Sequence, residues 1–220
     1  MSNRLAFSMI ELVMVIVVIS ILASVSISNF DKNIRRDAID SISHDIIYTQ
    51  QLALLDNKHN INDSRWQMTY WKWRYTLCSK SDKVFYSVSS DMNEKGNVNR
   101  VESAIDTYNG KYLYQSNYFC KEGATSNKDD SSRVIISERF GIKSISNGGS
   151  CKGDVQSVAF DSLGRPHRGV ESYSSPNYEF LMKKNCSFTF SFFDEDIEPF
   201  AIVIEAITGR VFLEEMEVVK

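Results

Sequence analysis

The hydrophobic residues of this chain form one continuous run near the start and alternating patterns further on. Residues 7–28 contain a single charged side chain, Glu11, among Val, Ile, Leu and Met. At about 1.5 Å of rise per residue, a helix of this length extends about 33 Å, enough to cross a hydrocarbon core of about 30 Å. The run therefore predicts a transmembrane helix at Phe7–Ser28, and no second run of this kind follows.

Three interpretations of this run compete. A cleavable secretory signal has an apolar core of about 7–15 residues and small residues at its cleavage site, as at Ser24–Ser26. A plain membrane anchor has no use for Glu11, since a carboxylate at the bilayer centre costs roughly 2.5–3.5 kcal/mol. The third interpretation gives Glu11 a role in assembly.

The residues around the start of the run carry a family resemblance. Ala6-Phe7-Ser8-Met9-Ile10-Glu11, followed by the apolar run, resembles the processing signal of type IV pilins and type II secretion pseudopilins. The resemblance implies that a prepilin peptidase removes a leader, residues 1–6, by cutting between Ala6 and Phe7. It also implies an N-methylphenylalanine at Phe7. In this family Glu11 would pair with the N-terminal amine of a neighbouring subunit. The family usually has Gly at the position of Ala6.

The same resemblance predicts location and partners. It implies a single-pass inner-membrane protein with its C-terminal domain in the periplasm, in contact with lipid through Phe7–Ser28. Its partners would be the prepilin peptidase, other pilins or pseudopilins in a fibre, and an inner-membrane assembly platform. The distribution of basic residues predicts the opposite orientation, with the C-terminal side in the cytoplasm. Lys32, Arg35 and Arg36 follow the apolar run, whereas only Arg4 precedes it. We follow the resemblance.

The pattern then becomes amphipathic. Ile39, Ile42, Ile46 and Ala53 share one helical face, and no Pro or Gly interrupts residues 7–55. Residues 29–58 are therefore expected to continue the helix and to lay one face on a β-rich domain, residues 59–220. The predicted fold class is α+β: a long N-terminal helix, half transmembrane and half amphipathic, packed on antiparallel sheet in the manner of a pilin.

Period-two alternation marks the strands of this domain. Trp71, Trp73, Tyr75 and Leu77 alternate with polar residues such as Lys72, which predicts a strand with one solvated face. Further strands are expected at Lys83–Ser89, Arg133–Ile136, Gly141–Ile145, Val155–Phe160 and Phe188–Phe192, with a hairpin of Phe200–Ala206 and Val211–Glu217. Two segments, Phe160–Pro166 and Ala201–Val211, resemble those of minor pseudopilins of the H type and FimT-type minor pilins.

The cysteines indicate an oxidising compartment. Cys78, Cys120, Cys151 and Cys186 all follow the apolar run, and none lies in a CxxC pair. An even number at wide spacing suits two disulfides, for which three connectivities are open, and buried free thiols are the alternative.

Charge and motifs favour a structural protein over an enzyme. The net charge of −3 gives no general case for nucleic-acid binding. The three histidines, His44, His59 and His167, lack metal-ligand spacing, and no nucleophile motif occurs. The acidic cluster at residues 194–198 lacks the ligand pattern of a calcium loop and reads as a solvated turn.

The sequence thus predicts a minor pseudopilin or minor pilin of a type II secretion system or type IV pilus. It would be a non-enzymatic protein without cofactor or metal, assembled into a short periplasmic fibre. The alternative is a binding module at a fibre tip that captures DNA or another surface ligand. Arg165, His167 and Arg168 form a small basic cluster in a predicted loop, and phosphate contacts would need several such groups to converge on one surface.

Overall fold

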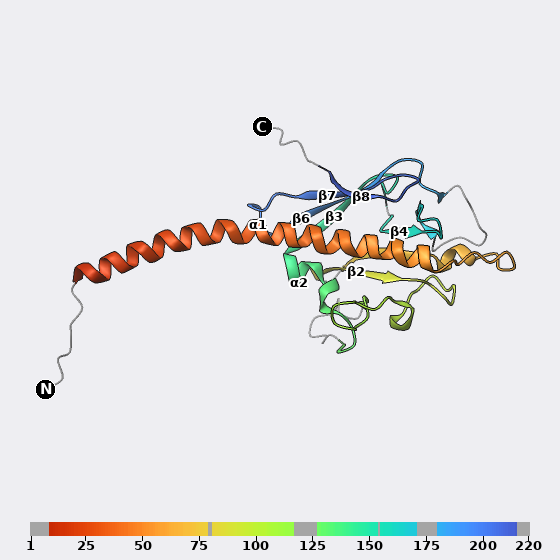
Figure 1. The fold of residues 1–220 in the computed structure, drawn as a ribbon, viewed down its shortest axis with the longest axis horizontal. Coiled ribbons are helices and arrows are strands. Elements are labelled where there is room, and N and C mark those ends of the chain that lie inside the picture. Colours follow the sequence, from red (N-terminus) through yellow and green to blue (C-terminus); the bar gives the residue numbers. More distant parts are fainter. Residues whose placement is uncertain (1–8, 79–80, 117–126, 154, 171–179, 215–220) are drawn as a thin grey trace.

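A computed structural model describes residues 9–78, 81–116, 127–153, 155–170 and 180–214, and of these the side chains of residues 23–32 are left out of the description. In this part of the chain the fold is α+β, with one long helix beside two four-stranded antiparallel sheets (Figure 1). The elements are α1 (Met9–Leu55), η1 (Trp66–Thr69), β1 (Trp71–Leu77), β2 (Val84–Ser89), η2 (Arg100–Glu102), η4 (Ser132–Val134), α2 (Ile136–Phe140), β3 (Ile142–Gly149), β4 (Ser157–Phe160), β5 (Pro166–His167), β6 (Cys186–Phe192), β7 (Phe200–Ile204) and β8 (Val211–Glu214).

The expected transmembrane half of the N-terminal helix requires a correction. Within the residues that the structure describes, no helix combines the length and the apolar character needed to cross a membrane. The predicted fold class was therefore wrong in its transmembrane segment.

The predicted location of the protein is also wrong, because it depended on that segment. A single-pass place in the inner membrane, with lipid around Phe7–Ser28 and the C-terminal domain in the periplasm, rested on a spanning helix at these residues. The described part of the chain contains none.

The second half of α1 packs into the body. Ala38, Ile42, Ile46 and Ala53 are at most 2 % exposed, at spacings that place them on one helical face. Ile39 is only partly buried at the edge of this face. Apolar residues at this spacing form a stripe that contacts strands of both sheets, so one face of the helix becomes part of the core.

The two sheets share one aromatic core. Their strand orders are β2-β1-β4-β5 and β3-β6-β7-β8. Phe188 of β6 lies with its ring centroid 5.3 Å from that of Trp73 and 5.8 Å from that of Tyr75, both on β1. The alternation of β6 is as predicted, because Phe188, Phe190 and Phe192 are buried and the residues between them are half-buried.

Two expectations for the strands were wrong. Lys72 was expected on a solvated face, yet it is 1 % exposed, so the face of β1 on which it lies is covered at this position. Residues 133–136 were expected to form a strand. They lie instead in η4 and at the start of α2, which ends at Gly141 in a left-handed conformation with φ of 69°. The predicted hairpin forms as β7 and β8, with residues 215–217 outside the described part.

Gln50 joins α1 to two turns of the body. Its side-chain Nε2 donates to the backbone oxygen of Gly164 at 2.8 Å and to that of Thr208 at 3.0 Å. Gly209, with φ of 69°, lies so close that an added Cβ would be 2.4 Å from the oxygen of Gly164 and 2.6 Å from Nε2 of Gln50. The turn therefore requires glycine both for its backbone conformation and for this close approach.

We expect Gly209→Ala to lower the free energy of unfolding by about 3 kcal/mol, through the left-handed backbone and the clash together. Gly110→Ala is the matched control. Its φ of 70° is nearly the same, but nothing lies within 4 Å of the added Cβ, so it should cost only about 1 kcal/mol. Urea denaturation of both full-length variants measures the difference, and equal losses would show that the close approach contributes nothing.

Candidate functional site

The residues of the predicted processing signal are only partly described. Ala6 and Phe7 lie outside the described residues. Glu11 lies in the first turns of α1 and is exposed. The position of the predicted cut and its methylated residue therefore remain predictions from the sequence.

The first half of α1 projects from the body (Figure 1). It carries an apolar surface. Its large hydrophobic side chains from Met9 to Leu22 are 48 to 87 % exposed. They face all sides of the helix, because nearly every position in this stretch is apolar. This is the largest run of exposed apolar side chains in the part of the chain that the structure describes.

The three cysteines in the described part of the chain are oxidised, in agreement with the disulfide interpretation of the sequence. Cys151 and Cys186 form a disulfide with a Cα–Cα distance of 5.0 Å, which links the chain just after β3 to the start of β6. Cys78 is also disulfide-bonded, and Cys120 lies outside the described residues. The free-thiol alternative is wrong for the three described cysteines.

The basic cluster considered for DNA is not an open surface. Nε of Arg165 lies 2.7 Å, and Nε2 of His167 lies 3.1 Å, from Oδ2 of Asp161. His167 is 3 % exposed and packs against Tyr70 with ring centroids 5.1 Å apart. Two of the three proposed phosphate contacts are therefore engaged by a carboxylate within the body.

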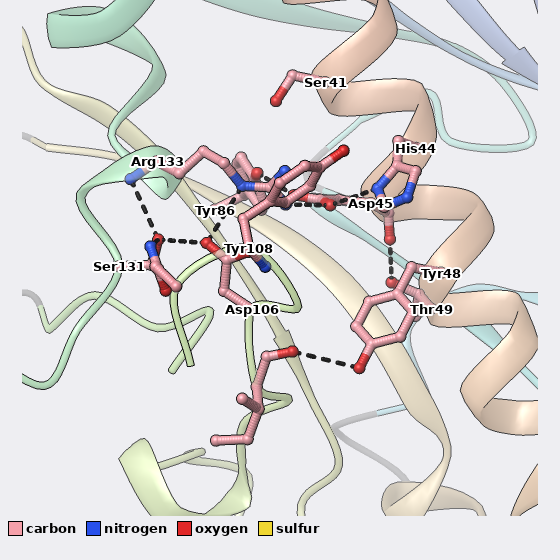
Figure 2. A network of polar contacts seen from close by, with 12 residues as sticks. Ser41, His44, Asp45, Tyr48, Thr49, Tyr86, Asp106, Tyr108, Ser131 and Arg133 are labelled. Carbon is pink, nitrogen blue, oxygen red and sulfur yellow. Dashed lines mark hydrogen bonds and ion pairs between the residues drawn. The ribbon is translucent and has the colours of Figure 1, made fainter. Parts of the chain in front are cut away.

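A buried network of polar residues lies where α1 meets the loop after β2 and the segment before α2 (Figure 2). Asp45 of α1 is fully buried and accepts hydrogen bonds from Nη2 of Arg133, at 2.6 Å to Oδ2, and from the hydroxyl of Tyr86. Asp106, also fully buried, lies 3.3 Å from Nε of Arg133. Arg133 thus bridges two carboxylates from different parts of the chain.

Further donors complete the network. Ser131 donates to Oδ2 of Asp106 at 2.6 Å, and the backbone nitrogen of Tyr108 donates to Oδ1 at 3.0 Å. Nδ1 of His44 lies 3.1 Å from Oδ1 of Asp45. Burial, and then the negative charge of Asp45, raise the pKa of Tyr86 well above its ordinary value, so its hydroxyl stays protonated and donates.

No local pattern in the sequence predicted this network. Asp45 and Thr49 follow Ile42 by three and seven positions, so they occupy core positions of the amphipathic face. A carboxylate within an apolar stripe is the signal that could have indicated a buried partner. No comparable indication that Arg133 is buried was present in the sequence, because residues 133–136 were expected to form a strand.

A cavity of about 840 Å³ opens beside the network. Its lining comes from α1, from the loop after β2, and from η4 and α2. The lining residues are Asp37, Asp40, Ser41, His44, Tyr108, Ser132, Arg133, Glu138 and Arg139. Among the described residues, no group of three or more His, Cys, Asp or Glu is placed to hold a metal ion.

We expect Asp45→Asn to lower the free energy of unfolding by about 3 kcal/mol, because it leaves the buried guanidinium of Arg133 with one carboxylate and breaks a buried ion pair. Asp40→Asn is the control. Asp40 pairs with Arg36 at 3.8 Å on the surface, and its loss should cost less than about 1 kcal/mol. Chemical denaturation at pH 7 compares the two, and similar losses would contradict a stabilising role for the network.

Asp161 makes stability depend on pH in the acid range. Burial alone would raise the pKa of Asp161, but hydrogen bonds from His167 and Arg165 outweigh it and lower the pKa to about 2. A carboxyl group with a depressed pKa in the folded state stabilises above its unfolded pKa of about 3.9, and this contribution is lost as pH falls toward 2. The carboxylate of Asp161 therefore contributes about 2 kcal/mol to the free energy of unfolding above its unfolded pKa.

The measurement compares the wild type with Asp161→Asn by urea denaturation between pH 5 and pH 2. The difference in unfolding free energy between the two proteins should shrink by about 2 kcal/mol across this range. A difference that does not change with pH would show that the carboxylate does not titrate as described. Other acidic groups cancel in the comparison, since both proteins carry them.

Comparison of the chain with protein-family models, with curated proteins and with solved structures found no match in any of the three. The function is therefore argued from the chain's own residues and their geometry.

Proposed function

We propose that this chain is a structural subunit of a pilus-like or pseudopilus-like fibre, which assembles through the projecting half of α1. The observation that carries the proposal is the exposed apolar surface of residues 9–22 on a helix whose second half is built into the body. Apolar patches larger than a few hundred Å² mark interaction sites in monomeric proteins. Burial of each Val, Leu, Ile or Met side chain contributes about 1.5–3 kcal/mol.

The shape of this surface favours other helices as its partner. A helix that is apolar on all sides can pack against several neighbours at once, as in the centre of a bundle. Identical or similar subunits that contribute one such helix each would bury the surface in a common core. Their bodies would then lie around the outside.

The joint between helix and body supports an ordered assembly. Arg35, where α1 enters the body, donates from Nε to the backbone oxygen of Glu198 at 2.9 Å and from Nη2 to that of Pro199 at 3.3 Å. Together with Gln50, these bonds fix the direction of the projecting helix. A fibre with a regular repeat needs such a fixed direction, whereas a tethered domain does not.

Glu11 is the only charged residue among residues 9–22. In a core of apolar helices its carboxylate requires a positive partner, because an unpaired buried charge is strongly unfavourable. The resemblance to pilin processing signals suggests what this positive partner would be. A prepilin peptidase that cuts between Ala6 and Phe7 creates an amine at Phe7, close to the next subunit's Glu11. The disulfides agree with a chain that is exported to an oxidising compartment.

The test uses the full-length chain, produced together with a prepilin peptidase and purified in detergent. After detergent removal, electron microscopy and sedimentation should show elongated assemblies. Ile16→Asp should abolish them, because a second carboxylate has no partner in the apolar core. Glu11→Ala should reduce them at least tenfold, since the loss of a buried pair exceeds about 1.4 kcal/mol.

The control is Leu163→Asp. Leu163 is 68 % exposed on the body, against 55 % for Ile16 on the helix, so both changes add a charge at an exposed apolar site. Only the change on the helix should prevent assembly. Unchanged assemblies with Ile16→Asp would show that the helix is not the contact, and the proposal would be wrong.

A further inference from the structure

We propose that the cavity beside α1 binds a basic side chain, the guanidinium of Arg or the ammonium of Lys, presented by another polypeptide. The cavity is the hollow of about 840 Å³ between α1, Tyr108 and α2. The inference does not depend on fibre assembly, because the cavity lies on the body and not on the projecting helix.

The first observation is an imbalance of buried charge below the cavity. Asp45 and Asp106 are both fully buried, and Arg133 is the cation that pairs with them. Two carboxylates against one guanidinium leave a net negative charge in a region shielded from water. Buried charges are normally compensated, so this arrangement attracts a further positive charge.

The second observation is the charge of the lining itself. Asp37, Asp40 and Glu138 contribute three carboxylates, whereas Arg139 adds one cation beside the already paired Arg133. Asp40 and Glu138 have partners outside the lining, Arg36 at 3.8 Å and Lys83 at 3.0 Å. Both pairs are largely exposed and contribute little.

The third observation is an aromatic wall. Tyr108 is 72 % exposed, and the guanidinium carbon of Arg133 lies 4.8 Å from its ring centroid. The ring of His44 lies edge-on to it at 6.1 Å. The face of a tyrosine ring attracts cations, and Arg133 already uses this property here. The exposed part of the ring remains available to a second cation.

The two arginines of the lining do not make it an anion site. Arg133 is held by two carboxylates, as described above. Arg139 donates from Nη1 to Ser41 at 3.4 Å, and its guanidinium carbon lies 4.7 Å from the ring centroid of Phe140. An anion in the cavity would face the buried Asp45 and Asp106 as well as the three carboxylates of the lining.

Size favours an organic cation on a chain over a metal ion. A volume of about 840 Å³ corresponds to more than twenty water molecules at about 30 Å³ each. It accommodates a whole arginine or lysine side chain with flanking backbone. The exposed carboxylates of Asp40 and Glu138 leave the cavity open to a partner's surface.

The experiment titrates acetyl-Gly-Arg-Gly-amide into the full-length protein at pH 7.5 and 0.15 M salt, with calorimetry or nuclear magnetic resonance as readout. We expect saturable binding that weakens about two- to fivefold in Asp37→Asn and in Tyr108→Ala, typical of an exposed charge pair and a cation–π contact. Asp196→Asn, on an exposed turn outside the lining, should leave the affinity unchanged.

Two further probes separate the alternatives. Acetyl-Gly-Glu-Gly-amide should not bind, and binding of this peptide in place of the arginine peptide would overturn the charge assignment. Methylguanidinium chloride should bind at least threefold more weakly than the arginine peptide, and equal affinity would assign the cavity to free cations. Absence of saturable binding by all three probes would overturn the proposal as a whole.

Discussion

The buried pair of Asp45 and Arg133 holds the long helix against the rest of the molecule. Asp45 is part of α1, whereas Arg133 belongs to a segment 88 positions further along the chain, between β2 and β3. The apolar stripe of α1 determines which face of the helix is buried, but apolar contacts are not directional and do not by themselves fix its position along the axis. A directional ion pair with defined hydrogen-bond geometry permits one register, and Tyr86 and Asp106 fix the same register from two other elements.

This difference between apolar packing and directional ion pairs explains how much of the fold could be predicted from the sequence. The alternation of Phe188, Phe190 and Phe192 indicated β6 correctly, because a strand with one buried face imposes a period of two on its own residues. The turn at residues 207–210 was predicted for a similar reason, since its residues determine a local conformation. Features that depend on a few consecutive residues are visible in a sequence.

The site was less accessible to prediction. The network depends on Asp45, Asp106 and Arg133, which no local pattern connects. Lys72 was assigned to solvent because alternation reveals which residues share a face, but not whether a neighbouring strand or helix covers the other face. The transmembrane segment was overpredicted because hydropathy reports apolar character alone, and apolar side chains serve protein contacts as well as lipid contacts.

The bonds between α1 and the body also have a mechanical consequence. Arg35 holds the chain just before β7, and Gln50, about four helical turns further on, holds the turns that follow β4 and β7. A pull along the projecting helix would load these attachments and the Asp45 pair together, in shear, because they lie side by side along one axis. The helix could therefore yield only by releasing several attachments at once. The body would therefore transmit tension as a unit, because the load is shared among several attachments and no single bond carries it alone.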